Sequence, residues 1–179
     1  MAANVPADAP AVAAFDLDGT LTHGGSVVHW LSAVAGARPV RRALVQHAVA
    51  LVDGAIRSGA AADAAKEALF TSVLEGQPLD EVAEVSSSFA DTHLRQAVRP
   101  EVVARLAEHL DRGHVVVVVS ASPSLYVARI AEALGAHGAA ATDLEVGPDG
   151  SLTGRCDGKN CRGEEKLRKV RALLDALAA

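Results

Sequence analysis

Hydrophobic positions divide the chain into short apolar runs and longer segments in which apolar residues recur every three or four positions. Residues 11–15 ("AVAAF") and 115–119 ("VVVVV") are apolar without alternation. Such short runs are typical of strands buried on both faces, so we predict strands at 11–15 and 115–122. Strands separated by helices pair in parallel through right-handed crossovers. The pattern therefore predicts an α/β fold.

Residues 27–97 show a helical pattern without a predicted strand. Helices are predicted over 27–36, 39–59, 61–76 and 78–98, each ending near a glycine or at the end of its periodic pattern. Asp80 is expected to cap the last of them. We expect an α/β core made of residues 1–26 and 98–179, with 27–97 as an all-helical insertion.

The second half of the chain returns to alternating helices and strands. Helices are predicted at 100–114, 122–138 and 163–179, and residues 139–156 are expected to form a strand, a turn at "PDG" and a returning strand. Ligands of such folds bind beyond the carboxyl ends of the parallel strands. Asp16 and Ser120 follow two predicted strands, so they are expected to lie near one crevice.

Composition and charge narrow the classes of partner. The 179 residues are half apolar with few aromatics, and the net charge of -5 argues against a nucleic-acid partner. The valine run is shorter than the roughly 20 apolar residues of a membrane span, and "MAANVPADAP" lacks the features of a signal peptide. We therefore expect a cytoplasmic protein without a membrane partner. Cys156 and Cys161 are expected to be two reduced thiols.

The stretch "FDLDGT" carries the candidate chemistry. Residues i and i+2 of an extended chain point the same way, so Asp16 and Asp18 are expected to face one site. Two close carboxylates repel unless a cation or a proton neutralises one of them, and Mg²⁺ is the hard cation that takes oxygen ligands. One carboxylate could attack phosphorus while the other transfers the proton. The alternative is a plain turn that ends the strand.

Three segments resemble the motifs of the haloacid dehalogenase (HAD) superfamily. "DLDGTLT" is similar to its first motif, the apolar strand ending at Ser120 to its second, and Lys166 in "GEEKLRKV" to its third. More narrowly, "SASPSLYVARIAEALGA", "DGSLTG" and "GEEK" resemble the phosphoserine-phosphatase-like IB subfamily. The resemblance implies a Rossmann-like parallel sheet, apparently incomplete, with an inserted all-helical cap of the C1 type over residues 27–97.

The resemblance also implies a role for each matching residue. Asp16 would be the nucleophile that forms an aspartyl-phosphate, and Asp18 would protonate the leaving alcohol and then activate water. Both would hold Mg²⁺, Asp16 through its carboxylate and Asp18 through its backbone carbonyl. Ser120 and Lys166 would bind the phosphoryl oxygens. The alternatives are a helix cap for Ser120 and a solvated surface cation for Lys166.

Departures from the subfamily leave the substrate open. No acidic residue follows "DLDGTLT" closely, no cap arginine stands in a family context, and Ser120 precedes alanine rather than glycine. Lys66 and Arg95 of the insertion are candidates to face the site, but an exposed helix face is the expected place for each. We expect a Mg²⁺-dependent phosphomonoester hydrolase acting on a small phosphorylated metabolite, phosphoserine-like or other. Transfer to an acceptor other than water would use the same residues.

The fourth HAD motif, an acidic pair, has no counterpart after Lys166, where Asp175 is the only acidic residue. The strand that would carry it is also missing from the pattern, which leaves residues 11–15 as an exposed sheet edge able to pair. The alternative hypothesis is therefore a truncated, catalytically impaired HAD homologue that acts as a binding or partner module, with self-association through that edge.

Overall fold

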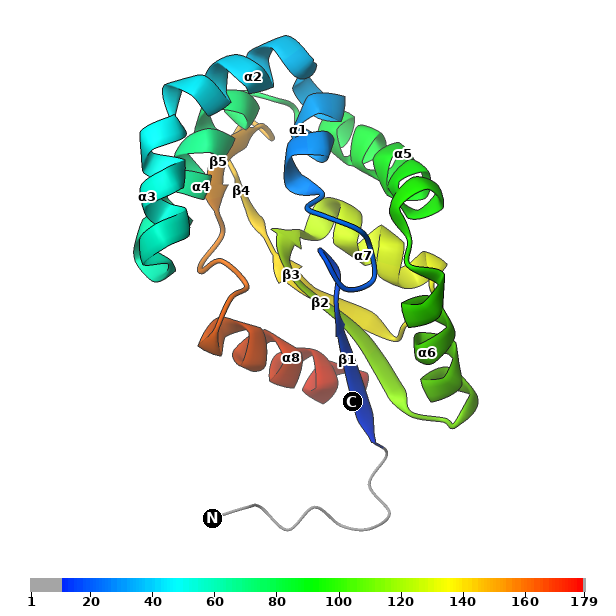
Figure 1. Cartoon of the computed structure of the whole chain (residues 1–179). Coiled ribbons are helices and arrows are strands. Elements are labelled where there is room, and N and C mark those ends of the chain that lie inside the picture. Colours follow the sequence, from blue (N-terminus) through cyan, green and yellow to red (C-terminus); the bar gives the residue numbers. More distant parts are fainter. Residues whose placement is uncertain (1–10, 179) are drawn as a thin grey trace.

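A three-stranded parallel sheet lies at the centre of the computed structural model, which describes residues 11–178 (Figure 1). Its strands, β1 (Val12–Asp16), β2 (Val115–Pro123) and β3 (Gly138–Thr142), follow the order β1-β2-β3. Asp16 pairs with Val119, which brings the carboxyl ends of β1 and β2 together. Residues 1–10, which were expected to begin the core and not to form a signal peptide, lie outside the described residues.

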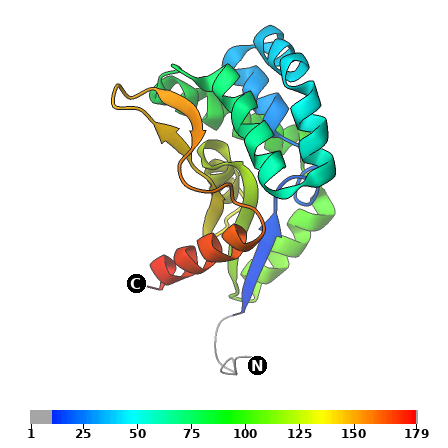
Figure 2. The ribbon, with the colours of Figure 1, turned by 90° about the vertical axis from the view of Figure 1, so that its left-hand side faces the viewer.

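The valine run of β2 is apolar throughout because both of its faces are covered. Val116 and Val118 belong to the main hydrophobic core, whereas Val117 and Val119 pack in a second cluster. That second cluster includes side chains of α8 (Glu164–Leu177). The other face is covered by α6 (Pro100–Asp111) and α7 (Ser124–Ala133), as Figures 1 and 2 show. The sheet is thus the middle of three layers.

Five helices lie between β1 and α6. They are α1 (Val27–Ala35), α2 (Ala37–Gln46), α3 (Ala48–Arg57), α4 (Gly59–Leu74) and α5 (Leu79–Ala97). They gather beyond the carboxyl ends of the strands (Figure 1). The α/β fold with a helical insertion is therefore confirmed, while its division at residues 27 and 97 stays a prediction. We call α1–α5 the cap.

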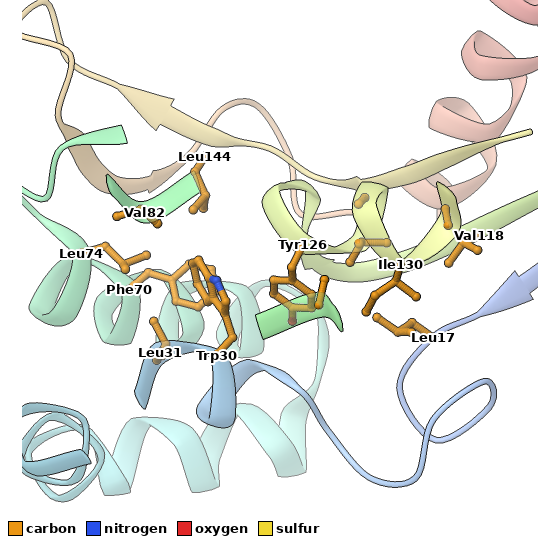
Figure 3. Packing of buried hydrophobic residues seen from close by; sticks show 14 of the residues in the cluster. Leu17, Trp30, Leu31, Phe70, Leu74, Val82, Val118, Tyr126, Ile130 and Leu144 are labelled. Atoms are coloured by element: carbon orange, nitrogen blue, oxygen red, sulfur yellow. The ribbon is translucent and has the colours of Figure 1, made fainter. Parts of the chain in front are cut away.

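The cap and the sheet share one hydrophobic core. Trp30 and Phe70 of the cap pack edge to face, and Trp30 also lies against Tyr126 of α7, with ring centroids 5.5 Å apart (Figure 3). The buried Trp30 Nε1 donates a hydrogen bond to Ser86 Oγ at 2.8 Å, so burial leaves this polar atom satisfied. This continuous packing holds the cap over the sheet edge.

Residues 139–156 differ from the prediction. Most of the first predicted strand joins the main sheet as β3, and the hairpin is made by β4 (Leu144–Val146) and β5 (Leu152–Cys156). The reason is burial: Ala140 and Ala141 are small enough to pack between α7 and α8. The hairpin packs against α4, where a side chain on Gly154 would meet the backbone of Thr71.

Two helix predictions are also wrong in detail. The single helix expected over 39–59 is interrupted at His47, whose Nε2 hydrogen-bonds Ser72 Oγ at 2.8 Å. Pro78, and not Asp80, is the N-cap residue of α5, which places Asp80 in the first turn. Among residues 11–178 no helix combines the length and apolar character that a membrane crossing requires. β1 lies at the edge of the sheet, as the pattern predicted.

Candidate active site

The side chain of Asp16 projects from the last residue of β1 and pairs with Lys166. Lys166 Nζ donates to Asp16 Oδ1 although 150 residues separate the two in the chain. Lys166 lies in the first turn of α8, which begins at the carboxyl edge of the sheet. The side chain of Lys166 is 33% exposed and that of Asp16 is 39% exposed, so a ligand can reach both.

Asp18 is held by hydrogen bonds at both carboxylate oxygens. Oδ1 accepts from the backbone N–H of Ser26 at 2.7 Å, and Oδ2 accepts from Ser122 Oγ at 2.5 Å. The chain turns sharply after β1: Thr22 N–H donates to the Leu17 carbonyl at 3.0 Å, and Gly19 adopts a φ of 80°. The fully buried Leu17 anchors the turn, and this fixes the direction of the Asp18 side chain.

A buried hydroxyl layer supports Asp18 from behind. Ser26 Oγ and Tyr126 OH hydrogen-bond at 2.7 Å, and Ser26 Oγ lies 3.5 Å from Ser122 Oγ. Burial raises the pKa of Tyr126, so its hydroxyl stays protonated. None of these three residues was predicted from the sequence. Only the position of Ser122, two residues beyond Ser120 on the same strand, could have pointed to it.

Ser120 and Ala121 end the regular part of β2 at the same edge. Ser120 is almost completely buried, and its Oγ accepts a hydrogen bond from Ser122 N–H at 3.0 Å. This bond occupies a lone pair of the hydroxyl and leaves its proton available to another acceptor. Ser120 does not cap a helix, which was the alternative. The N-cap residue of α7 is Pro123, and no side chain forms a capping hydrogen bond there.

One cavity of about 360 Å³ brings the four predicted site residues together. Its wall combines Asp16, Asp18, Ser120 and Lys166 with residues that were not predicted there: Ala62, Asp63, Lys66, Ala121, Asn160 and Arg162. Thr20 lies in the turn after β1, where its N–H bonds the Leu17 carbonyl at 3.2 Å.

Lys66 of α4 reaches into this cavity, so the prediction that it lies on an exposed helix face is wrong. Its Nζ donates to the Ala121 carbonyl at 2.5 Å and to Asn160 Oδ1 at 2.8 Å. The ammonium group also lies 5.2 Å from the centroid of the Phe70 ring. Burial lowers the pKa of Lys66. Arg95, in contrast, is exposed and bonds Thr92 Oγ1 at 3.2 Å.

Asn160 connects the cap with the sheet. Its Nδ2 donates to Asp63 Oδ1 at 2.6 Å, while its Oδ1 accepts from both Lys66 and Thr142 Oγ1 of β3. Thr142 Oγ1 in turn accepts from the N–H of Cys161 at 3.0 Å. No periodic pattern marks the loop that carries Asn160, which explains why sequence reasoning missed it.

The oxygen atoms in this cavity match the preference of Mg²⁺, which commonly binds proteins through one or two carboxylates together with waters and phosphate oxygens. Asp16 provides one such carboxylate, and Asp18 lies beside it in the same cavity wall. Residues 11–178 contain no group of three or more His, Cys, Asp or Glu side chains arranged to hold a metal. The donors therefore fit a Mg²⁺ ion completed by substrate and water. Cys156 and Cys161 are free thiols, as expected.

Comparisons with known proteins identify the family of this chain. The family model of haloacid dehalogenase-like hydrolases matches residues 13–179. Protein CicA of Caulobacter vibrioides is 34% identical over 165 residues, which cover 90% of this chain and 72% of CicA. Phosphoserine phosphatase SerB1 of Mycobacterium tuberculosis is 31% identical over 94% of this chain and 55% of its own length.

A solved structure supports the same assignment. A Bordetella pertussis Tohama I protein of unknown function has 27% sequence identity and a TM-score of 0.75, over 94% of this chain and 76% of that one. The sequence resemblance to HAD proteins is thus confirmed by family model, relatives and fold. The chain belongs to the haloacid dehalogenase-like hydrolases.

Proposed function

We propose that this chain is a Mg²⁺-dependent phosphomonoester hydrolase that acts through an aspartyl-phosphate on a small phosphorylated metabolite. The observation that carries the proposal is the pair of differently held carboxylates in one cavity. Among the described residues, the Asp16 carboxylate has one hydrogen-bond partner, the Lys166 ammonium group, whereas the Asp18 carboxylate is fixed by two hydrogen bonds. A nucleophile needs a free oxygen that faces the phosphorus, and an acid-base group needs a fixed direction.

In the first step, an Asp16 carboxylate oxygen attacks the phosphorus and the bond to the leaving oxygen breaks. Asp18, in its protonated form, gives its proton to that oxygen, which leaves as an alcohol. Lys166 and the Ser120 hydroxyl bind the non-bridging phosphoryl oxygens, where negative charge is greatest in the transition state. The contact between Lys166 and Asp16 supports this placement, because the ammonium already lies beside the attacking group.

In the second step, Asp18 takes a proton from a water molecule, which attacks the phosphorus of the aspartyl-phosphate. The bond between phosphorus and Asp16 breaks, inorganic phosphate leaves, and both carboxylates return to their starting forms. Ser26 and Ser122 hold Asp18 through both steps. Mg²⁺, held by the Asp16 carboxylate and the Asp18 backbone carbonyl, would neutralise the negative charge of the phosphoryl group.

The cap provides the remaining wall and therefore the choice of substrate. Asp63 and Lys66, three residues apart on α4, add one carboxylate and one ammonium group to the cavity. A cavity of about 360 Å³ suits a small metabolite. Residues 27–97 would act as the unit that covers the site and excludes water. SerB1 is a phosphoserine phosphatase by name, and an amino-acid phosphate is one candidate of this size and charge.

The test is hydrolysis of a panel of small phosphomonoesters by the purified chain, with Mg²⁺ and with a chelator. We expect metal-dependent phosphate release that Asp16→Asn abolishes. Asp111→Asn is the matched control, because Asp111 is an exposed residue at the end of α6, outside the cavity. Folded protein that binds phosphate analogues without hydrolysing any ester would contradict the proposal and favour the binding-module alternative.

A further inference from the structure

The outer face of α2 and α3 carries a stripe of exposed β-branched side chains. Val45, Val49, Val52 and Ile56 are 74%, 85%, 60% and 78% exposed. Val49, Val52 and Ile56 are spaced three and four residues apart and lie on one side of α3, and Val45 lies in the last turn of α2, just before the break at His47. We call these four residues the cap stripe. Ala48 and Asp53 join its last three members around a shallow hollow of about 420 Å³.

Packing within the protein does not require these apolar residues. α3 contacts its neighbour α4 through the opposite side. There the buried Gly54 lies so close to α4 that a Cβ atom added to it would come 2.8 Å from Ala62 Cα. Single exposed apolar residues are ordinary on protein surfaces, but contiguous apolar patches mark interaction sites. The cap stripe is such a patch.

Basic residues lie at both ends of the stripe. Arg38, Arg41 and Arg42 are exposed on α2, and Arg57 ends α3. Asp53 is the sole acidic residue of the two helices, and its Oδ1 lies 2.7 Å from Arg57 Nε. Within residues 11–178, no carboxylate forms an ion pair with the three α2 arginines. This cation excess stands out in a chain whose net charge is -5.

Two of these arginines border a second hollow, which lies between α2 and α4. Arg38 and Arg42 line a depression of about 500 Å³ together with Pro39, Ala43, Gln46 and Ser72. Arginine binds phosphate oxygens through several N–H donors at once. The surface thus combines exposed apolar side chains with phosphate-binding groups that have no acidic partner among the described residues.

We propose that this face binds the surface of an anionic lipid bilayer. The cap stripe enters the boundary between headgroups and acyl chains, and Arg38, Arg41 and Arg42 contact lipid phosphates. Charge favours this partner over a second copy of the chain. A two-fold interface pairs a patch with itself, and the three α2 arginines would then meet an end of the patch whose one acidic residue, Asp53, is already paired with Arg57. The sequence-based expectation of no membrane partner depended on the lack of a spanning segment, which surface binding does not need.

The position of the stripe relates it to the catalytic cavity. The stripe ends just before Arg57, α4 begins at Gly59, and Ala62 and Asp63 of α4 line the cavity. Gly54 and Ala62 are in direct contact. Lipid binding through α3 would therefore hold the cap wall of the cavity one helix away from the bilayer surface. Binding itself is independent of the proposed hydrolase activity and can be measured without a substrate.

The test is flotation of the full chain with vesicles of phosphatidylcholine alone or mixed with phosphatidylglycerol. We expect binding to the anionic vesicles only, weakened by added salt. Val49→Ser/Ile56→Ser and Arg41→Glu/Arg42→Glu should each lower the partition coefficient about tenfold or more, since apolar insertion and arginine attraction both contribute. Val146→Ser is the matched control, because Val146 is also an exposed valine, on β4 of the hairpin.

Circular dichroism and light scattering complete the experiment. The substituted side chains are exposed, so all variants should keep the wild-type spectrum and unfolding temperature. Absence of wild-type binding to anionic vesicles would overturn the proposal, as would equal loss in Val146→Ser. A wild-type dimer that Val49→Ser/Ile56→Ser converts to monomers, without vesicle binding, would overturn it in favour of self-association.

Discussion

The catalytic cavity has two halves that are built differently. The sheet half consists of Asp16, Asp18 and Ser120 at the ends of β1 and β2, with Lys166 beside them. Its side chains bond to each other, to the Ser122 hydroxyl and to the backbone N–H groups of Ser26 and Ser122. The cap half consists of Asp63 and Lys66 on α4, which reach the sheet through Asn160 and the Ala121 carbonyl.

We infer from this difference that the sheet half carries out the chemistry and the cap half selects the substrate. Groups fixed by the sheet can hold the reacting atoms within the narrow tolerance that phosphoryl transfer needs. Groups on the cap are positioned through a few polar contacts across two structural layers, so they can vary with the substrate. We therefore expect changes in the sheet half to lower kcat and changes in the cap half to raise KM.

The largest effect is expected from Asp18→Asn. The asparagine keeps the shape of the side chain but can neither protonate the leaving oxygen nor take a proton from water, so kcat should fall about 10²- to 10⁴-fold. Esters with a leaving group as acidic as p-nitrophenol need no protonation. With them, the first release of p-nitrophenol should stay fast while turnover remains slow. Rapid-quench kinetics with p-nitrophenyl phosphate and an alkyl phosphate measure this difference.

An equal loss of the first and the later turnovers with p-nitrophenyl phosphate would contradict a proton-transfer role for Asp18. It would indicate that Asp18 mainly shapes the site. Ser122→Ala provides the control for position. It removes the hydroxyl that donates to Asp18 Oδ2 while leaving the acid itself, so its effect on kcat should be smaller than that of Asp18→Asn.

The sheet half was accessible from the sequence because its signals are local. Asp16 and Asp18 stand two residues apart after an apolar run, and Ser120 directly follows the valine run. Parallel pairing then brings the two strand ends together. Lys166 came from the resemblance to HAD proteins, because nothing in the composition of α8 distinguishes it from the neighbouring cations. Their catalytic roles remain predictions.

The cap half was not accessible for a physical reason. Lys66 lies in the alanine-rich stretch "GAAADAAKEALF", where small side chains on every side hide which face packs inward. Asn160 belongs to a loop without periodicity, and its three partners come from one helix, α4, and one strand, β3, which lie far apart in the chain. The hairpin of β4 and β5 was misplaced similarly, because alanines 139–141 fit a buried strand and a hairpin equally well.

A smaller effect is expected from Lys66→Met. Methionine keeps the length of the side chain but removes the charge, so KM should rise about tenfold while kcat changes less than about threefold, as for a lost ground-state contact. Lys159→Met is the matched control, because Lys159 borders a neighbouring cavity but does not line the catalytic one. Steady-state kinetics with the preferred substrate measure both constants. A fall in kcat as large as that of Asp18→Asn would contradict the assignment of different roles to the two halves.

The smallest effect concerns stability and pH. Burial lowers the pKa of Lys66 below its ordinary value of 10.5, so between the lowered value and 10.5 the unfolded chain binds more protons at this site than the folded chain. Stability at this site must then rise with pH in that window. Other groups also titrate in this pH range, but wild type and Lys66→Met have these groups in common, so their contributions largely cancel in the difference between the two proteins. The free energy of unfolding of wild type minus that of the variant should therefore increase from neutral pH towards 10.5.

Urea unfolding at several pH values measures this difference, with Lys159→Met again as the control that should show no such trend. A difference that falls with rising pH would mean that Lys66 keeps its charge in the folded state and is stabilised by Asp63 and Asp18 more than it is penalised by burial. The charge of Lys66 would then help to hold the cap half against the sheet half. A rising difference means that the Lys66 charge is costly without a ligand, and that an anionic substrate would relieve this cost on binding.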